Sequence, residues 1–327
     1  MTAKPVICLG CALWDTIFKV DSIPSGGGKV LPSAVIQASS GMATAAAVTI
    51  ARLGAPVSLW ARIGDDATGR MFLDDLAREG IAVSGIRQVP GGRTPISTIL
   101  VDGEGERLVV PYFDPSLDPD PGWLPLHEIG AAGAVLCDMR WPEGARVVFA
   151  EARRLGVATI LDADVAPIED LRALIPLADH VLFSEPALRS LVDDEPAKAL
   201  LRIAGEIGAE VLGVTLGARG SAIWQRDDRG GKLQRFPTLE IRAVDTLNAG
   251  DVWHGTYAFG LVQGWELART VRVASVAAAI KCERFGGRLG APRWVELAER
   301  LSLERGPLQD DAALGAPSQH TISKASS

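Results

Sequence analysis

The sequence predicts an α/β fold, a Rossmann-type sandwich with a mostly parallel central sheet and a small antiparallel β lid. Short apolar runs alternate with amphipathic segments of helical period, which is typical of parallel strands joined by crossover helices. Two other stretches alternate apolar and polar residues around turn signals, which is typical of antiparallel ribbons. The 327 residues are 47% hydrophobic and 22% charged, an ordinary composition for a globular protein.

The expected strands of the body are short, apolar and separated by helical patterns. They are Val6–Leu9, Val57–Ile63, Ala134–Cys137, Ala158–Leu161, His180–Phe183 and Val211–Thr215. The expected helices are Gly41–Leu53, Ala67–Glu79, Ala145–Leu155 and Ala197–Ile207, the first two stopped by glycines at 54 and 80. Further along, a strand-like segment, Leu239–Val244, leads into a helical pattern, Val252–Leu261.

The two ribbons are Thr16–Ala38 and Ile96–Tyr112, with turn signals at Pro24–Gly28 and Asp102–Gly105. They can pair in space and cover a cleft in the α/β body. We therefore expect one domain over residues 1–305, with a lid from about 12–39 and 92–114. Residues 306–327 are rich in Ser, Ala, Gln and Asp and are expected to be a disordered tail.

Composition and charge exclude several partners. The net charge is −7 and no basic run is present, so we expect no nucleic-acid partner. No uninterrupted apolar stretch is long enough to span a bilayer and no signal peptide is visible, so we expect a cytoplasmic protein without a membrane partner. The four cysteines and four histidines lack metal-ligand spacing, so no metal site of their own is expected.

The sharpest chemical signal is the run Asp245–Asp251, D-T-L-N-A-G-D. Small residues just ahead of a helix leave backbone N–H groups open to an anion, and Gly250 allows close approach of the backbone. A carboxylate at Asp251 beside that anion site suits phosphoryl transfer, in which amides stabilise the moving group and the carboxylate accepts a proton. Asp251 could equally be a helix cap, and the spacing alone leaves both interpretations open.

This run resembles the D-T-x-G-A-G-D signature of the ribokinase/PfkB carbohydrate kinases, with Asn248 in place of the first glycine. Other segments resemble the family in the same order, and the resemblance covers Val6 to Leu301. They are Gly10–Asp15, Gly41–Gly54, Ile63–Gly69, Thr215–Gly220 and Gly286–Gly287. The resemblance implies a ribokinase-like kinase domain that transfers the γ-phosphate of ATP, with Mg²⁺, to a hydroxyl of a small-molecule sugar.

The resemblance also implies roles for individual residues. Asp251 is the catalytic base, and the amides of Asn248, Ala249 and Gly250 form the anion hole. Asp15 and Gly41 bind the sugar. The ATP-binding residues are Ser184, Glu185, Thr215, Gly217, Gly220, Gly286 and Gly287. By the same resemblance a monovalent cation such as K⁺ lies near the anion hole. Exposed lid edges favour pairing, so we expect a homodimer through the lid.

Two departures from the family pattern affect magnesium and the sugar. Ser184 and Ala187 stand where the family often has N-x-x-E, whose glutamate helps to place magnesium. Glu185 could act on the metal through water, or it could simply begin the next helix; both interpretations stay open. Ala45 stands where ribokinases carry an asparagine that binds a sugar hydroxyl, so ribose recognition of the usual kind is not expected.

Four segments resemble the bacterial sulfofructose kinases, whose substrate is a ketohexose with an anionic end. They are Pro24–Val30, Cys137–Trp141, Phe183–Pro186 and Lys281–Gly290. Arg140, just past the end of a strand, and Lys29, in the lid, could hold a sulfonate or phosphate. Alternatively, Lys29 is a solvated lid residue and Arg140 pairs with Asp138 or Asp162. Pro111 occupies a lid position where a polar side chain would favour such an anion.

Two other functions remain open. One is a nucleoside kinase on the same fold, for which the lid offers the aromatic residues Trp14, Phe18, Tyr112 and Phe113. The other is a sugar-binding sensor without catalysis, which the missing glutamate at Ala187 favours. Three more polar residues, Asp162, Asp164 and His254, could face the cleft or serve the core.

Overall fold

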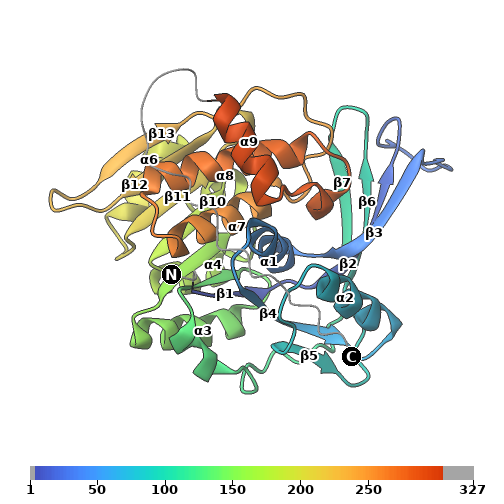
Figure 1. The fold of residues 1–327 in the computed structure, drawn as a ribbon, viewed down its shortest axis with the longest axis horizontal. Helices are drawn as coiled ribbons and strands as arrows, with labels where there is room; N and C mark the ends of the chain where they lie inside the picture. The colour runs from blue at the N-terminus through green and yellow to red at the C-terminus, as the bar shows by residue number, and fades with distance from the viewer. Residues whose placement is uncertain (1–3, 305–327) are drawn as a thin grey trace, which may run out of the picture.

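A computed structural model describes residues 4–304 and shows a nine-stranded sheet in the order β13-β12-β11-β10-β9-β8-β1-β4-β5 (Figure 1). The seven strands from β11 to β5 run parallel, and β12 and β13 extend the sheet antiparallel. Their bounds are β1 Val6–Gly10, β4 Val57–Gly64, β5 Ile86–Val89, β8 Ala134–Asp138, β9 Ala158–Ala163, β10 His180–Ser184, β11 Val211–Thr215, β12 Ser221–Gln225 and β13 Lys232–Phe236.

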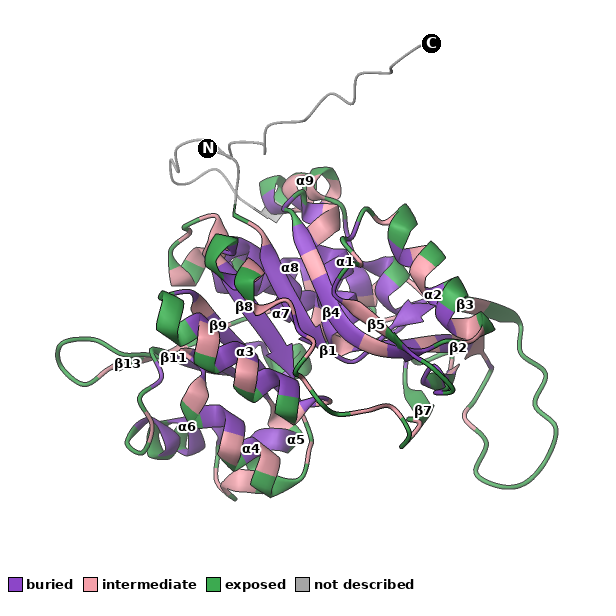
Figure 2. Cartoon of the chain, turned by 90° about the horizontal axis from the view of Figure 1, so that it is seen from below, coloured by how far each residue is buried: buried purple, intermediate pink, exposed green. Residues whose placement is uncertain are grey.

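Helices cover both faces of this sheet, as the alternation of strands and helices predicts. One face carries α1 Met42–Leu53, α2 Ala67–Arg78, α7 Ala249–Val262, α8 Leu267–Cys282 and α9 Trp294–Glu304. The other carries α3 Pro142–Leu155, α4 Ile168–Leu174, α5 Glu185–Leu191 and α6 Pro196–Ala204. The central strands are therefore buried on both sides (Figure 2). Such strands are continuous apolar runs rather than alternating ones.

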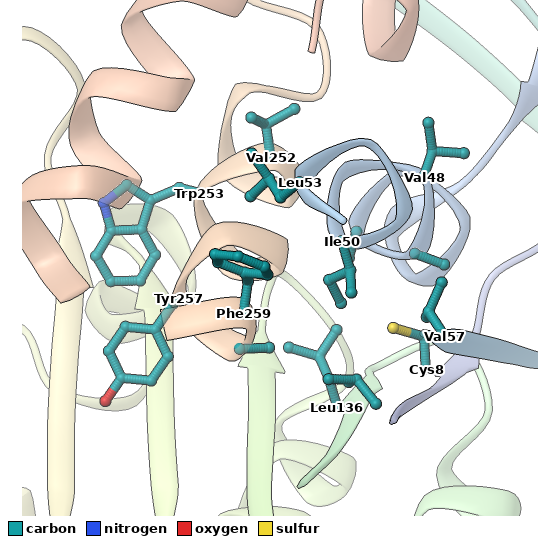
Figure 3. Packing of buried hydrophobic residues seen from close by; sticks show 14 of the residues in the cluster. Cys8, Val48, Ile50, Leu53, Val57, Leu136, Val252, Trp253, Tyr257 and Phe259 are labelled. Atoms are coloured by element: carbon teal, nitrogen blue, oxygen red, sulfur yellow. The ribbon is translucent and has the colours of Figure 1, made fainter. Parts of the chain in front are cut away.

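The core that positions the site lies between α1, α7 and the sheet (Figure 3). Ile50 and Leu53 of α1 pack in one cluster with Val252 and Phe259 of α7. A methyl group added to Gly255 would lie 2.6 Å from the carbonyl oxygen of Ala46, so the two helices approach to backbone contact. This packing fixes the start of α7, where the signature run lies.

The lid is a second sheet of four strands, in the order β3-β2-β6-β7, that projects from the body (Figure 1). The strands are β2 Leu13–Lys19, β3 Ala34–Ser40, β6 Ile96–Val101 and β7 Arg107–Tyr112. Each predicted ribbon is an antiparallel pair, and the ribbons join through the parallel pair β2–β6. The parallel contact arises because both strands enter the lid from the body in the same direction.

The segment Leu239–Val244 was predicted to be strand-like, and this prediction is wrong. It forms a loop, because its end is hydrogen-bonded to a helix and not to a neighbouring strand. The N–H groups of Val244 and of the following Asp245 both donate to the carbonyl of Cys282 in α8. The predicted tail, 306–327, lies outside the described residues. Within residues 4–304, no helix is long and apolar enough to cross a membrane.

Candidate active site

A cavity of about 1240 Å³ lies between the lid and the carboxyl ends of the parallel strands, where open α/β sheets bind ligands. The lid, the strand ends and the start of α7 all contribute to its lining. The polar lining residues are Asp15, Ser40, Ser97, Arg107, Arg140, Asp162, Asp164, Ser184, Thr215, Thr238, Glu240, Thr246, Asn248, Asp251, His254 and Ser275.

The start of α7 presents backbone N–H groups to this cavity. Asn248 precedes the helix with φ 61°, the only positive φ of a non-glycine residue in the described chain. Asn tolerates this left-handed conformation better than most residues. No described residue accepts a hydrogen bond from the N–H groups of Asn248, Gly250 or Asp251, whereas that of Ala249 lies 3.3 Å from the Thr246 carbonyl. Ala249, Gly250 and Asp251 form the first helical turn instead of preceding the helix. The Ala249 amide, predicted to belong to the anion hole, is taken up by the Thr246 carbonyl, and the amides of Asn248, Gly250 and Asp251 make a ready anion site.

Asp251 lines the cavity beside those amides. Its Oδ2 accepts a hydrogen bond of 2.6 Å from Nδ2 of Asn248. Burial raises the pKa of Asp251 to about 7, with a further rise from the charge of Asp162, while the hydrogen bond from Asn248 acts in the opposite direction. A carboxylate with a pKa near the working pH is well suited to accept a proton.

Behind Asp251 lies a buried pair of titratable groups. Nδ1 of His254 is 3.2 Å from Oδ2 of Asp162, and both side chains are 3% exposed. Neither atom makes an aligned hydrogen bond, so the contact is electrostatic. Burial opposes a charge on His254, but the charge of Asp162 prevails and the pKa of His254 is raised. The pair and Asp164 all line the cavity, which places these three residues at the cleft.

The opposite wall of the cavity is built around two other aspartates. Asp15 lines the cavity, is 3% exposed and accepts a hydrogen bond from the Ser97 hydroxyl; burial raises the pKa of Asp15 to about 6. Asp138, which sequence analysis considered only as a partner of Arg140, instead accepts backbone N–H groups from Cys11 (2.7 Å), Ala43 (2.9 Å) and Arg140 (2.8 Å). It therefore fastens the loop after β1, the start of α1 and the loop after β8 to one another.

Gly41 lines this wall with φ 111°. A methyl group there would lie 2.4 Å from the carbonyl oxygen of Cys11, so both the space and the backbone conformation require glycine.

Of the two predicted anion-binding cations, only Arg140 lines the cavity. It contacts the Asp164 carboxylate at 3.4 Å and donates to the Val165 carbonyl at 2.8 Å. The ion pair predicted as an alternative therefore exists, but its partner is Asp164 and not Asp138 or Asp162. Lys29 lies in the exposed loop between β2 and β3 (Figure 2) and is not among the lining residues.

The predicted ATP-binding residues separate into two groups. Ser184, Thr215, Gly217 and Gly220 line the cavity. Glu185, Gly286 and Gly287 are not among the lining residues, and each of them contacts another side chain of the protein. Glu185 pairs with Arg189 at 2.9 Å and also with Arg219, so its carboxylate is not free to bind magnesium directly.

Gly286 and Gly287 brace the signature run. Their N–H groups donate to Oδ2 of Asp245 at 2.9 and 2.8 Å. Within residues 4–304, no group of three or more His, Cys, Asp or Glu side chains is placed to hold a metal ion.

Arg107 is a lining residue that sequence analysis missed. From β7, its guanidinium donates to the Thr246 hydroxyl at 2.5 Å, and that hydroxyl lies 3.2 Å from the Gly105 carbonyl. The β6–β7 hairpin thus closes onto the signature run. Arg107, Val109 and Pro111 all line the cavity, so the period of two along this strand was the available signal.

Comparisons with known proteins agree with this geometry. The family model for pfkB family carbohydrate kinases matches residues 3–294. The chain is 26% identical over 309 residues to the ribokinase of Bacillus subtilis, covering 91% of this chain and 100% of that protein. A solved structure from Agrobacterium tumefaciens, provisionally described as a ribokinase, is 44% identical with a TM-score of 0.88, covering 93% of this chain and 100% of that one. Arabidopsis thaliana ribokinase complexed with ribose and ATP has a TM-score of 0.79 at 21% identity, covering 92% and 99% of the two chains, a likeness of fold.

Proposed function

The chain belongs to the pfkB family of carbohydrate kinases, and from this premise we propose that it phosphorylates a sugar hydroxyl with Asp251 as general base. One observation carries the proposal: the Asp251 carboxylate borders the cavity beside N–H groups of Gly250 and Asn248 that have no acceptor within residues 4–304. A hydroxyl that gives its proton to Asp251 becomes the nucleophile, and the free amides stabilise negative charge on the phosphoryl group as it moves.

The nucleotide would lie along the side of the cavity formed by Thr215, Gly217, Gly220 and the end of α8. Magnesium ATP supplies the phosphoryl group and its charge neutralisation. The protein then has to position the chain of phosphates, exclude water and remove one proton. The lid hairpin, through Arg107 and Thr246, closes over the place where this transfer occurs.

For the sugar we propose a ketohexose with an acidic group. Asp15 and Gly41 border the side of the cavity opposite α7, and carboxylates are good acceptors for sugar hydroxyls. Arg140 supports an anionic end, because its ion pair with Asp164 is long and half-exposed, and a bidentate anion would be a stronger partner. Lys29 lies outside the lining and is not part of this proposal.

The test is a substrate panel with ADP formation as the readout. Ribose, fructose, sulfofructose, fructose phosphates and nucleosides would be compared by kcat/KM. The proposal expects the highest value for an acidic ketohexose. A nucleoside preference would identify a nucleoside kinase. Sugar binding by calorimetry without any ADP formation would identify a sensor, and either result would refute the proposal.

We also propose a homodimer formed through the lid. The lid carries large apolar side chains that are exposed in the isolated chain, on β3, β6 and β7. They are Val35, Ile96, Leu108, Val109, Val110 and Tyr112. Exposed apolar side chains that gather on one element are a feature of protein–protein contact sites. Sedimentation of the chain should give a dimer, and Val110→Asp should give a monomer.

A further inference from the structure

We infer that the ammonium group of Lys281 replaces a bound monovalent cation beneath the anion hole, so that this kinase works without potassium. The inference rests on the proposed function and concerns the same loop. Lys281 lies in α8 with 0% exposure, and its Nζ is 2.5 Å from the carbonyl oxygen of Asp245 and 3.3 Å from Oδ1 of the same residue. A lysine buried to this degree is rare unless it is paired.

The oxygens around Lys281 are of the kind that a potassium ion binds. Backbone carbonyl and carboxylate oxygens replace the hydration shell of such ions. Here they are already occupied. The ammonium donates to the backbone carbonyl of Asp245 and lies next to its carboxylate oxygen Oδ1. Oδ1 also accepts a hydrogen bond of 2.8 Å from the N–H of Leu247. The second carboxylate oxygen accepts both Gly286 and Gly287, which leaves no free ligand at this residue.

A potassium ion therefore does not fit next to Asp245. An added cation would face the fixed positive charge of Lys281 without any free anionic partner at this residue. The repulsion would be strong, because Lys281 and Asp245 are both fully buried and screening by water is weak there.

The fixed charge has a consequence for phosphoryl transfer. Asp245 and Asp251 stand at the two ends of the run whose amides face the cavity. Without a counter-charge, the buried Asp245 carboxylate would repel phosphate oxygens at those amides. Lys281 neutralises it from the side of α8 and holds its carbonyl, so the loop is set before the nucleotide arrives. Such preorganised charge is effective in transition-state stabilisation.

Burial lowers the pKa of Lys281, and the charge of Asp245 opposes that effect. The positive charge of Lys281 is part of the chain itself. Unlike a bound potassium ion, it does not depend on the salt in the medium.

The first test uses the wild-type chain after removal of potassium. Turnover with the best sugar would be measured in potassium, sodium and tetramethylammonium chloride at equal ionic strength. We expect rates equal within about twofold, the scatter of ionic-strength effects on surface charges. A rate in potassium more than about threefold above that in tetramethylammonium, beyond that scatter, overturns the inference.

A second test removes the ammonium and measures binding instead of activity. In Lys281→Ala the oxygens of Asp245 lose their cation. Potassium should then raise the melting temperature of the variant in a concentration-dependent way, as ligands of the folded state do. The wild type, and the control Lys232→Ala at an exposed lysine, should show no such effect.

The two readouts separate the possible failures. A folded Lys281→Ala that potassium does not stabilise contradicts the replacement. If that variant does not fold in any salt, the wild-type melting temperatures in potassium and tetramethylammonium decide, and stabilisation by potassium contradicts the inference. A wild type that phosphorylates no sugar refutes the proposed function, while the melting temperatures still test the cation site.

Discussion

The signature run and the lid border the same cavity but are built in opposite ways. The run starts at Asp245, which is fully buried and held by three backbone N–H groups and the Lys281 ammonium. The lid strand β7 has every residue exposed, and it contacts the run through the hydrogen bond from the Arg107 guanidinium to the Thr246 hydroxyl. The proposed phosphate end of the site is therefore preorganised, whereas the proposed sugar end depends on an element with few packing constraints.

This difference explains why chemistry is easier to infer here than the substrate. A buried, fully bonded loop tolerates few residues, so its sequence carries a strong signal. An exposed strand tolerates many side chains, and small changes there alter the sugar that fits without altering the reaction.

Because the run Asp245–Asp251 is buried and fully bonded at Asp245, we expect Asp245→Ala to cause a large loss in the free energy of unfolding. The substitution leaves the Lys281 ammonium buried without a partner, and breaking a buried pair costs about 3–5 kcal/mol. Urea denaturation measures this loss. The control Asp228→Ala, at an exposed carboxylate in the β12–β13 turn, should change the free energy of unfolding by less than about 0.5 kcal/mol. Equal small changes in both variants would show that the run is not anchored as described.

For the contact between the lid and the run, made by Arg107 and Thr246, we expect a smaller effect, on kcat/KM. Arg107→Ala removes the hydrogen bond to Thr246, a loss of about 1.5–3 kcal/mol, so kcat/KM should fall roughly 10–150-fold. Leu108→Ala, on the next residue of the same strand, is the matched control and should have little effect on turnover. If both variants turn over like the wild type, the lid does not need to close on the run.

Within the run, Asn248 should tune the base. Its hydrogen bond lowers the pKa of Asp251, so Asn248→Gly should raise that pKa and move the acid limb of the kcat/KM profile to higher pH. The loss of activity should then be several-fold below pH 7 and disappear at pH 9, where Asp251 is ionised in both proteins. Glycine accepts φ 61° without strain, so the fold is preserved. A loss that is the same at every pH would indicate a structural role only.

The last predictions concern the proposed sugar end of the cavity. Arg140→Gln should lower kcat/KM for an acidic ketohexose by roughly tenfold, as expected for a charge-assisted contact, and leave a neutral ketohexose unchanged. Lys29→Gln should change neither value by more than about twofold, since exposed charges contribute little. A larger effect of Lys29 than of Arg140 would show that the loop between β2 and β3 reaches the substrate.

Sequence analysis predicted the α/β body, both ribbons of the lid and the position of Asp251, because each depends on a local pattern. Periodicity identified the strands, and the run of small residues at the start of α7 indicated the part of the cavity where Asn248, Gly250 and Asp251 lie. The contacts that fasten this site are long-range. Lys281 meets Asp245 across 36 residues and Arg107 meets Thr246 across 139, and no local pattern reports such pairs. The strand predicted for Leu239–Val244 was wrong for the same reason. Its apolar pattern suits a strand, but its end is hydrogen-bonded to the distant helix α8.

The central claim is that Asp251 removes the proton of the accepting hydroxyl. Asp251→Asn keeps the shape of the side chain and its place beside Asn248 but removes the base. The account predicts that kcat falls by about 10²–10⁴-fold while the affinities for sugar and ATP, measured by calorimetry, change only a few-fold. Turnover near the wild-type rate in this variant would contradict it.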